Sequence, residues 1–458
     1  MLKIYLDWNI ITHLKDDKNK ELFTFLLTNK DKFIFPYSKA HIKDLLVSKS
    51  ENNKYYEQDL QLLTDICEHH LLEHEQNINN PYPYKCYPKD YLDLKGAELE
   101  ILSSGFSKES FYKYLMNNDL NPESLMLIFE KEKIEPFAIP FINKAIGNLA
   151  DLFSVMFEYG PSLFNDKKTP KQIQNYIQTT TDDSQYKKIQ GSNSTNIFKE
   201  LDTVVFSQTN KTFVELVENP IAERSKSNLE LFTSLYLTLN LSGFFADKNR
   251  NLQNIYTDSE HAYYASSCDI FVSDDSRLRE KTSAIYSQYN IPTKIISSDK
   301  LIAIMSEGLS HNYDIKHMFT HDLPLYGKPI RTEGENNVYK QLPYRFWGLF
   351  NYCINLRIPE TNNRTGIFRI VIPPRSYVFY TELERFFELI ISIISGEEYK
   401  LLFREEFVSK FLTKNKDIID TATFTIDCPD YLIQLSADQE THIPLPIMFI
   451  TEKAAVNN

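Results

Sequence analysis

The sequence of 458 residues is poor in cysteine and glycine, and it lacks the common nucleotide-binding motifs. Its five cysteines are scattered and none belongs to a CxxC pair, which argues against a zinc or disulfide framework and favours reduced thiols in a cytoplasmic protein. Neither a P-loop nor a GxGxxG motif is present, so hydrolysis of nucleotides through such a motif is excluded. No apolar run approaches the roughly 18 residues of a membrane span, and Asp7 interrupts the short N-terminal one. We therefore expect neither a membrane anchor nor a signal peptide.

Positive charge is also scarce, because the formal net charge is −12. This balance argues against a protein that coats nucleic acid by bulk electrostatics, although it leaves room for an enzyme with a local basic rim. The content of 42% hydrophobic and 24% charged residues is typical of a soluble globular protein. With only 12 glycines against 28 tyrosines and 31 phenylalanines, we expect regular, aromatic-rich structure. The length predicts two or three domains.

The hydrophobic pattern alternates between strand and helix near the N-terminus and again after the middle of the chain. Apolar runs at residues 2–6 and 33–37 predict buried strands, each followed by a helical pattern. The same rhythm returns with a helix over 259–267, a strand over 270–273 and a helix over 276–286. This order predicts an α/β fold with a three-layer parallel sheet.

The remaining segments carry different patterns. Residues 51–249 are dominated by apolar stripes at helical spacing and predict a large helical insertion, with polar loops over 77–88 and 179–195. Strand patterns over 368–372 and 423–426 lie in the last part of the chain. The expected organisation is therefore a discontinuous core at 1–50 and 250–305, the insertion at 51–249, a linker at 306–332, and a C-terminal α+β domain at 333–458 whose role the sequence does not indicate.

Carboxylates stand where these predicted strands end or helices begin. Asp7 follows the first strand, Asp258 precedes the helix predicted to begin at Ser259, and Asp274 and Asp275 follow the strand at 270–273. Taken singly, each acid fits a helix cap or a solvated surface. However, ligands of open α/β sheets bind at the carboxyl ends of the strands, and acids gathered there repel one another unless a divalent cation neutralises them. The joint placement therefore predicts a metal site.

These segments resemble the motifs of the PIN-domain nucleases over residues 1–50 and 250–302. Leu6-Asp7-Trp8-Asn9 resembles the family's opening strand that runs into Asp-x-Asn, and Asp44 matches a helical acid after the second strand. Asp258, with Ala262 and Ala265, matches D-x-x-x-A-x-x-A, and Ser273-Asp274-Asp275 matches a strand that ends in Ser-x-Asp. Should the register differ, Glu260 and Asp269 are the alternative acids. The resemblance implies a PIN-like core interrupted by the insertion.

The resemblance also implies a set of roles. One or two Mg²⁺ or Mn²⁺ ions would activate water and stabilise charge on a phosphate, with Asp7, Asp44, Asp258 and Asp275 as catalytic acids. Asp7, Asp258 and Asp275 are the expected metal ligands, supported by Asp274. The expected contacts to the acids or to the nucleic acid come from these residues: Asn9, Ser273, Arg277, Arg279 and Lys281. For the three basic residues, a solvated helix face is an equally good interpretation.

The favoured hypothesis is a metal-dependent ribonuclease, in the manner of a toxin or a phage-defence effector that a regulatory protein partner or homo-oligomerisation controls. One alternative is a DNA nuclease with the same acids, because residues alone do not reveal contacts to the 2′-hydroxyl. The other is a catalytically inactive PIN-like scaffold. Two further features carry less weight: His70 and His74, one turn apart on an expected polar helix, and His261, which fits either the site or the core.

Overall fold

The computed structural model describes residues 1–50, 54–74, 80–103, 183–204, 212–215, 228–247 and 250–310, the strand segments 328–331, 338–345, 353–359, 365–371, 424–428, 431–438 and 445–452, and a few single residues. The chain divides into two compact units. The first, which we call the core unit, comprises Lys3–Lys30 and Phe35–Leu301. The second, the C-terminal unit, comprises Ile302–Asn458 together with the short segments Met1–Leu2 and Asp31–Ile34. The predicted helical insertion thus falls in the same unit as the predicted core.

A parallel three-stranded sheet lies in the core unit. Its order is β1 (Ile4–Leu6), β5 (Ile270–Val272), β6 (Lys294–Ile296), and Leu6 pairs with Val272 in register. β1 and β5 are buried along their whole length, as apolar strands of a parallel sheet are when both faces are covered. Because the strands are parallel, the residues that follow them emerge at one edge of the sheet.

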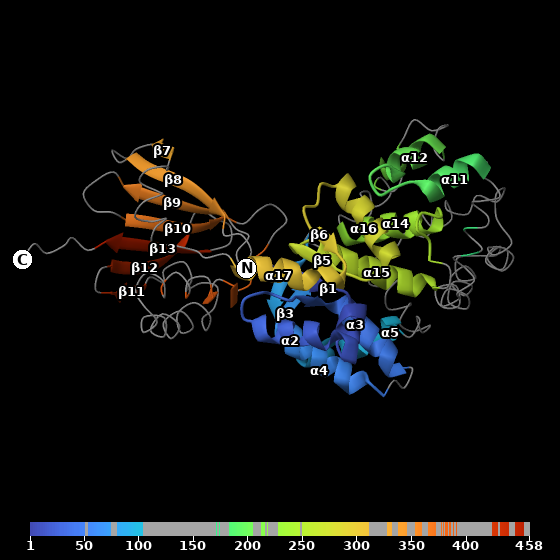
Figure 1. Ribbon diagram of the computed structural model, residues 1–458, viewed down its shortest axis with the longest axis horizontal. Coiled ribbons are helices and arrows are strands. Elements are labelled where there is room, and N and C mark those ends of the chain that lie inside the picture. Colours follow the sequence, from blue (N-terminus) through green and yellow to red (C-terminus); the bar gives the residue numbers. More distant parts are fainter. Residues whose placement is uncertain are drawn as a thin grey trace, which may run out of the picture. The chain divides into compact units, whose positions relative to one another are not determined.

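Three helices from the second half of the core unit form a layer beside this sheet (Figure 1). α15 (Leu252–Ala265) packs against β1 and β5, and α16 (Ser276–Gln288) packs against β6. α14 (Asn228–Leu241) packs on both helices, and its apolar side chains fill the space between them. α14 therefore belongs to the body that carries the sheet, although its sequence lies within the insertion.

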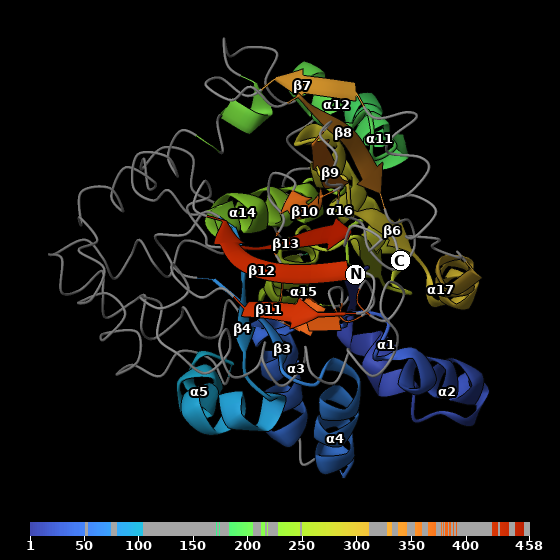
Figure 2. The ribbon, with the colours of Figure 1, turned by 90° about the vertical axis from the view of Figure 1, so that its left-hand side faces the viewer.

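A second small sheet in the core unit has the order β2 (Tyr37–Ser38), β3 (His70–Glu73), β4 (Tyr82–Lys85). The strand predicted over 33–37 is thus shorter and pairs with β3. α3 (Lys39–Ser50), α4 (Tyr56–Cys67) and α5 (Pro88–Ser103) pack on one another beside it (Figure 2). The core unit also contains η1 (Asp17–Asn19), α1 (Trp8–His13), α2 (Lys20–Asn29), α11 (Asp183–Gly191), α12 (Ile197–Val204) and η2 (Ser298–Lys300).

Several expectations for the insertion were wrong. The segment with His70 and His74 was predicted to be helical, but His70 begins β3 and its Nδ1 lies 3.0 Å from the carbonyl oxygen of Cys67. The adjacent pair Leu71 and Leu72 is completely buried, and so short an apolar run fits a strand as well as a helix. β4 lies in the loop predicted over 77–88, and α11 lies in the one predicted over 179–195.

The C-terminal unit contains a seven-stranded antiparallel sheet of order β11-β12-β13-β10-β9-β8-β7, visible in Figure 1. Its strands are β7 (Lys328–Arg331), β8 (Val338–Arg345), β9 (Cys353–Pro359), β10 (Thr365–Val371), β11 (Phe424–Asp427), β12 (Tyr431–Asp438) and β13 (Leu445–Glu452). The two predicted strands correspond to β10 and β11. Both α17 (Leu301–Ser310) and β7 extend into the segment expected to be a linker.

The structure therefore confirms the α/β class with parallel strands, while the PIN-like arrangement remains a prediction. The side chains of four cysteines are described, and all four are buried: Cys67, Cys86, Cys268 and Cys428. Within the described residues, no helix combines the length and apolar character that crossing a membrane requires.

Candidate functional site

Asp7 lies at the carboxyl edge of the parallel sheet. Its backbone N–H donates to the Val272 carbonyl at 2.8 Å, and its carbonyl accepts from Ile10 at 2.9 Å at the start of α1. The side chain does not cap that helix. It accepts a hydrogen bond from the Ser273 hydroxyl at 2.8 Å, although it is only 2% exposed. Burial raises the pKa of the Asp7 carboxyl, and the charge of Asp44 contributes to the rise.

Asp258 lies in the middle of α15, so the prediction that it precedes this helix was wrong. The helix begins earlier because the side chain of Asn251 accepts a hydrogen bond from the backbone N–H of Asn254 at 2.8 Å and caps it. Asp258 and His261 are separated by three helical positions and therefore share a face of α15. Burial, opposed by the charge of Arg250 and aided by that of Asp7, raises the pKa of Asp258 to about 7.

The two consecutive acids after β5 have different partners. Asp275 caps α16: its Oδ1 accepts from the backbone N–H groups of Arg277 at 2.9 Å and Leu278 at 3.2 Å. The exposed Asp274 accepts from the backbone and the hydroxyl of Ser298, at 2.9 and 2.7 Å. The second oxygen of Asp275 therefore remains available to Arg250, whereas Asp274 stabilises the turn at Ser298, after β6.

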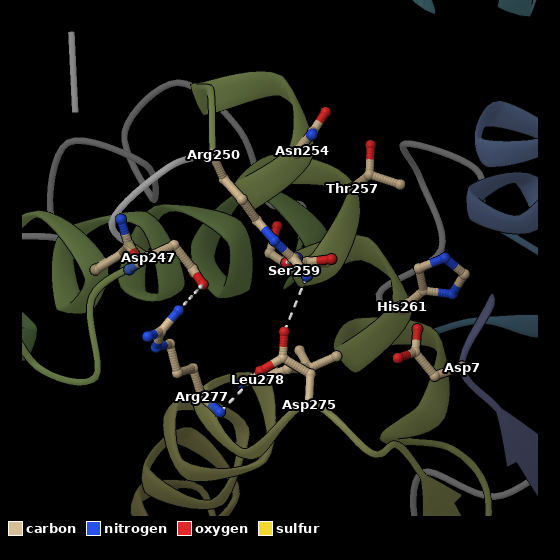
Figure 3. A network of polar contacts seen from close by, with 12 residues as sticks. Asp7, Asp247, Arg250, Asn254, Thr257, Ser259, His261, Asp275, Arg277 and Leu278 are labelled. Carbon is tan, nitrogen blue, oxygen red and sulfur yellow. Dashed lines mark hydrogen bonds and ion pairs between the residues drawn. The ribbon is translucent and has the colours of Figure 1, made fainter. Parts of the chain in front are cut away.

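Arg250 joins Asp258 to Asp275, and no motif in the sequence predicts this role. Its Nη1 donates to Asp258 Oδ2, and its Nη2 donates to Asp275 Oδ2 at 3.0 Å. Figure 3 shows the side chain reaching from the start of α15 toward Asp275, with Asp7 and His261 beside one another. An arginine directly before a helix cap belongs to no motif, and only the fold brings it to the acids.

Asp44 contacts His261, a residue for which the sequence allowed either a role in the site or a place in the core. Nε2 of His261 lies 2.9 Å from Asp44 Oδ2, and Nδ1 lies 2.9 Å from the Tyr5 hydroxyl. Burial by itself lowers the pKa of His261, but the hydrogen bond and the charge of Asp44 outweigh it and raise the pKa above its ordinary value. In its protonated form the ring would donate to both Asp44 and Tyr5, and its charge would lower the pKa of the nearby Asp7 carboxyl.

The predicted basic contacts have separate surroundings. Lys281 is completely buried and donates to Asp247 at 2.6 Å and to Asn240 at 2.9 Å, so the expectation that it meets a nucleic-acid backbone was wrong. Arg279 donates to the Ser273 carbonyl at 2.7 Å. Arg277 is exposed, with one nitrogen 3.8 Å from Asp247. Asn9 lies half-buried in the first turn of α1.

The two alternative acids are engaged elsewhere. Glu260 is completely buried and forms an ion pair with Lys43 at 2.6 Å. Asp269 accepts from the backbone N–H of Lys3 at 2.8 Å. Both contacts are structural and lie apart from the bridge of Arg250 between Asp258 and Asp275.

The donor chemistry suits a hard divalent cation, because the site offers carboxylate oxygens. In the described part of the chain, no three acidic, histidine or cysteine side chains are grouped closely enough to hold a metal ion as they stand. Two of the acids nevertheless converge on one positive charge, which is the guanidinium of Arg250. The residues fit a cation, and in this conformation the protein supplies one itself.

Comparison with protein-family models, curated proteins and solved structures finds no match for this chain.

Proposed function

We propose that this protein is a metal-dependent phosphodiesterase with a PIN-like site, and that it cleaves RNA. The observation that carries the proposal is the meeting of segments about 250 residues apart in sequence. Asp7 is bonded to Ser273 after β5, and Asp258 shares a cation with Asp275. Those are the segments whose motifs resemble the family: Asp7 and Asp275 follow two neighbouring parallel strands, and Asp258 meets Asp275 through Arg250.

Asp7, Asp258 and Asp275 would hold the ion, which when bound lowers the pKa of water and neutralises charge on a phosphate. The chain's own residues prepare the acids for this role. Ser273 fixes the direction of the Asp7 carboxylate, and the backbone of α16 fixes Asp275 through its cap. Burial raises the pKa of both Asp7 and Asp258, so their ionised forms are costly without a nearby positive charge.

His261 has a supporting role in this proposal. Its ring lies between Tyr5 and Asp44, so it holds the fourth acid in place from within the protein. The positive charge of the ring also acts on Asp7 and lowers the cost of ionising that carboxyl. On the nucleic-acid side, the exposed Arg277 follows the last acid and is available to a phosphate.

A second candidate is favoured by one observation. Arg250 already balances charge on Asp258 and Asp275, as expected for a PIN-like scaffold that keeps the fold without turnover. A DNA nuclease would use the same acids. The experiment must therefore separate three outcomes.

The test is incubation of the purified chain with single-stranded RNA and single-stranded DNA, in Mn²⁺ and in EDTA. We expect cleavage of RNA in Mn²⁺ only, and a loss of roughly 100-fold or more in Asp7→Asn and Asp258→Asn. Asp17→Asn, which removes an exposed carboxylate from η1, should cleave at the wild-type rate. Cleavage of DNA alone would favour the DNA nuclease, and no cleavage of either would favour the scaffold. An Asp7→Asn protein of undiminished activity would exclude the proposed site.

A further inference from the structure

Arg250 lies between two acids that come from different helices. Asp258 belongs to the middle of α15 and Asp275 to the cap of α16, and the guanidinium donates to one oxygen of each. The side chains of Arg250, Asp258 and Asp275 are 31%, 15% and 18% exposed, so solvent and small ions reach them. The two acids therefore form a solvent-accessible site that the guanidinium of Arg250 already occupies, and Figure 3 shows Arg250 reaching toward Asp275.

A second observation is a buried hydroxyl on α14, the helix that packs on both acid-bearing helices, α15 and α16. Tyr236, on α14, is completely buried, and its hydroxyl has no hydrogen-bond partner among the described residues. The charges that act on it are those of Asp258, Asp247, Asp275 and Arg250. Lys281 does not serve this hydroxyl, because its Nζ lies over the ring, 4.7 Å from the centroid. A buried hydroxyl without a partner is costly, so a water or ligand oxygen bound next to it would stabilise the folded protein.

We propose that Arg250 is a competing cation that occupies the divalent-ion site of Asp258 and Asp275 until the ion displaces its guanidinium. The inference rests on the proposed function and adds a control on metal loading. Asp258 and Asp275 each use one carboxylate oxygen to accept a hydrogen bond from Arg250. Those two oxygens cannot bind an ion at the same time. The ion must therefore overcome the Arg250 contacts, and Arg250 sets the ion concentration at which the site fills.

The sign of the effect separates competition from a structural role. If Arg250 merely positioned the acids, its removal would disorder them and weaken metal binding. If Arg250 competes, its removal frees both carboxylates and tightens binding. Residues that contact metal ligands commonly change metal affinity by about 10- to 100-fold, which sets the scale of the measurement.

The experiment is isothermal titration of the full chain with Mn²⁺. Arg250→Met should bind Mn²⁺ about tenfold more tightly than wild type or better. Arg250→Lys keeps the charge without the fork of donors, so it should lie between the two. Equal or weaker binding by Arg250→Met overturns the proposal.

Tyr236→Phe supplies a second comparison. It should weaken Mn²⁺ binding because it removes the hydroxyl that would donate a hydrogen bond to an oxygen ligand of the ion. Tyr264→Phe is its matched control, since Tyr264 also has a buried hydroxyl with no partner in the described structure, but the charges acting on it include Glu260 and Glu73 rather than Asp258 or Asp275. A loss of affinity that is the same in both variants counts against a role for this site.

A measurement on the wild type protects the test against an Arg250→Met chain that does not fold. Modification by phenylglyoxal, mapped by mass spectrometry, should increase at Arg250 when Mn²⁺ saturates the protein, and an unchanged extent overturns the proposal. The failure of the proposed function is distinguishable. Cleavage of RNA in Mn²⁺ with no effect of Arg250 on affinity rejects the competition alone, whereas absence of both Mn²⁺ binding and cleavage in all variants rejects both.

Discussion

The strongest evidence at the scale of single residues is the environment of Asp258. A carboxyl with an ordinary pKa of 3.8 reaches about 7 because burial outweighs the attraction of Arg250. The charges of Asp7 and Asp247 act in the same direction as burial. Such a group is poorly matched to a purely structural role, because its ionised form destabilises the folded chain. Its environment is typical of acids at functional sites.

This environment predicts how stability depends on pH. The folded state binds the Asp258 proton more tightly than the unfolded state does, so this residue makes the protein less stable as pH rises from about 4 to about 7. Asp258→Asn removes the titrating group and should raise the free energy of unfolding at pH 8 by at least about 1 kcal/mol in the absence of metal.

The check is urea unfolding of wild type and Asp258→Asn at pH 4, 6 and 8 in EDTA. The difference between the two proteins should grow with pH. A difference that does not vary across this range would show that Asp258 titrates normally. Asp17→Asn, with its carboxylate exposed, is the matched control and should follow wild type.

At the scale of secondary-structure elements, a buried ion pair joins α3 to α15. Lys43 donates to both oxygens of Glu260, at 2.8 and 2.6 Å, and Lys39 lies 3.5 Å from the same carboxylate. Burial raises the pKa of Glu260, but the two lysines lower it more, so the group is ionised. The pair fixes α3, which carries Asp44, relative to α15, which carries Asp258 and His261.

Breaking this pair on one side should be costly. Glu260→Gln leaves the buried Lys43 without its counter-charge and should lower the free energy of unfolding by about 3–5 kcal/mol. The double variant Lys43→Met with Glu260→Met removes both charges and should recover most of that loss. Denaturant unfolding of the single and double variants measures both values. If the double variant is as unstable as Glu260→Gln, the loss does not come from the uncompensated charge of Lys43.

The sequence predicted the elements that follow from local pattern and missed those that follow from tertiary contacts. Short apolar runs located β1 and β5, and the acids after them led to the carboxyl edge of the sheet. The start of α15 was misplaced because Asn251 and Asp258 are equally good caps, and the helix forms from the first. β3 was mistaken for a helix because its apolar run is too short to show a period.

The candidate site shows the same division. Asp7, Ser273 and Asp275 follow from motif and strand position, and the structure brings them to one edge. Arg250 could not be foreseen because its role depends on two acids from separate positions, Asp258 in the middle of α15 and Asp275 at the cap of α16. Lys281 was misjudged because a lysine in a helix after an acid is usually solvated, whereas this one is buried against Asp247.

At the scale of the whole molecule, every acid of the candidate site belongs to the core unit. The seven-stranded sheet belongs to the C-terminal unit, and none of the residues assigned to the site comes from it. A ligand of the acids therefore acts first on the stability of one unit. Binding to the folded state alone stabilises by RT ln(1 + [L]/Kd), which is about 2.7 kcal/mol at 100 times Kd.

We therefore expect Mn²⁺ to protect the two units unequally. In hydrogen exchange of the full chain, saturating Mn²⁺ should slow exchange in α15 and α16 and leave exchange in β8, β9 and β10 unchanged. The reason is that the carboxylates assigned to the site all belong to the core unit. EDTA should reverse the effect, and Asp7→Asn should abolish it. Equal protection of both units would place the ion elsewhere, or show that the units unfold together. Protection confined to α15 and α16 ties the bound ion to Asp258 and Asp275, the two acids that Arg250 now joins.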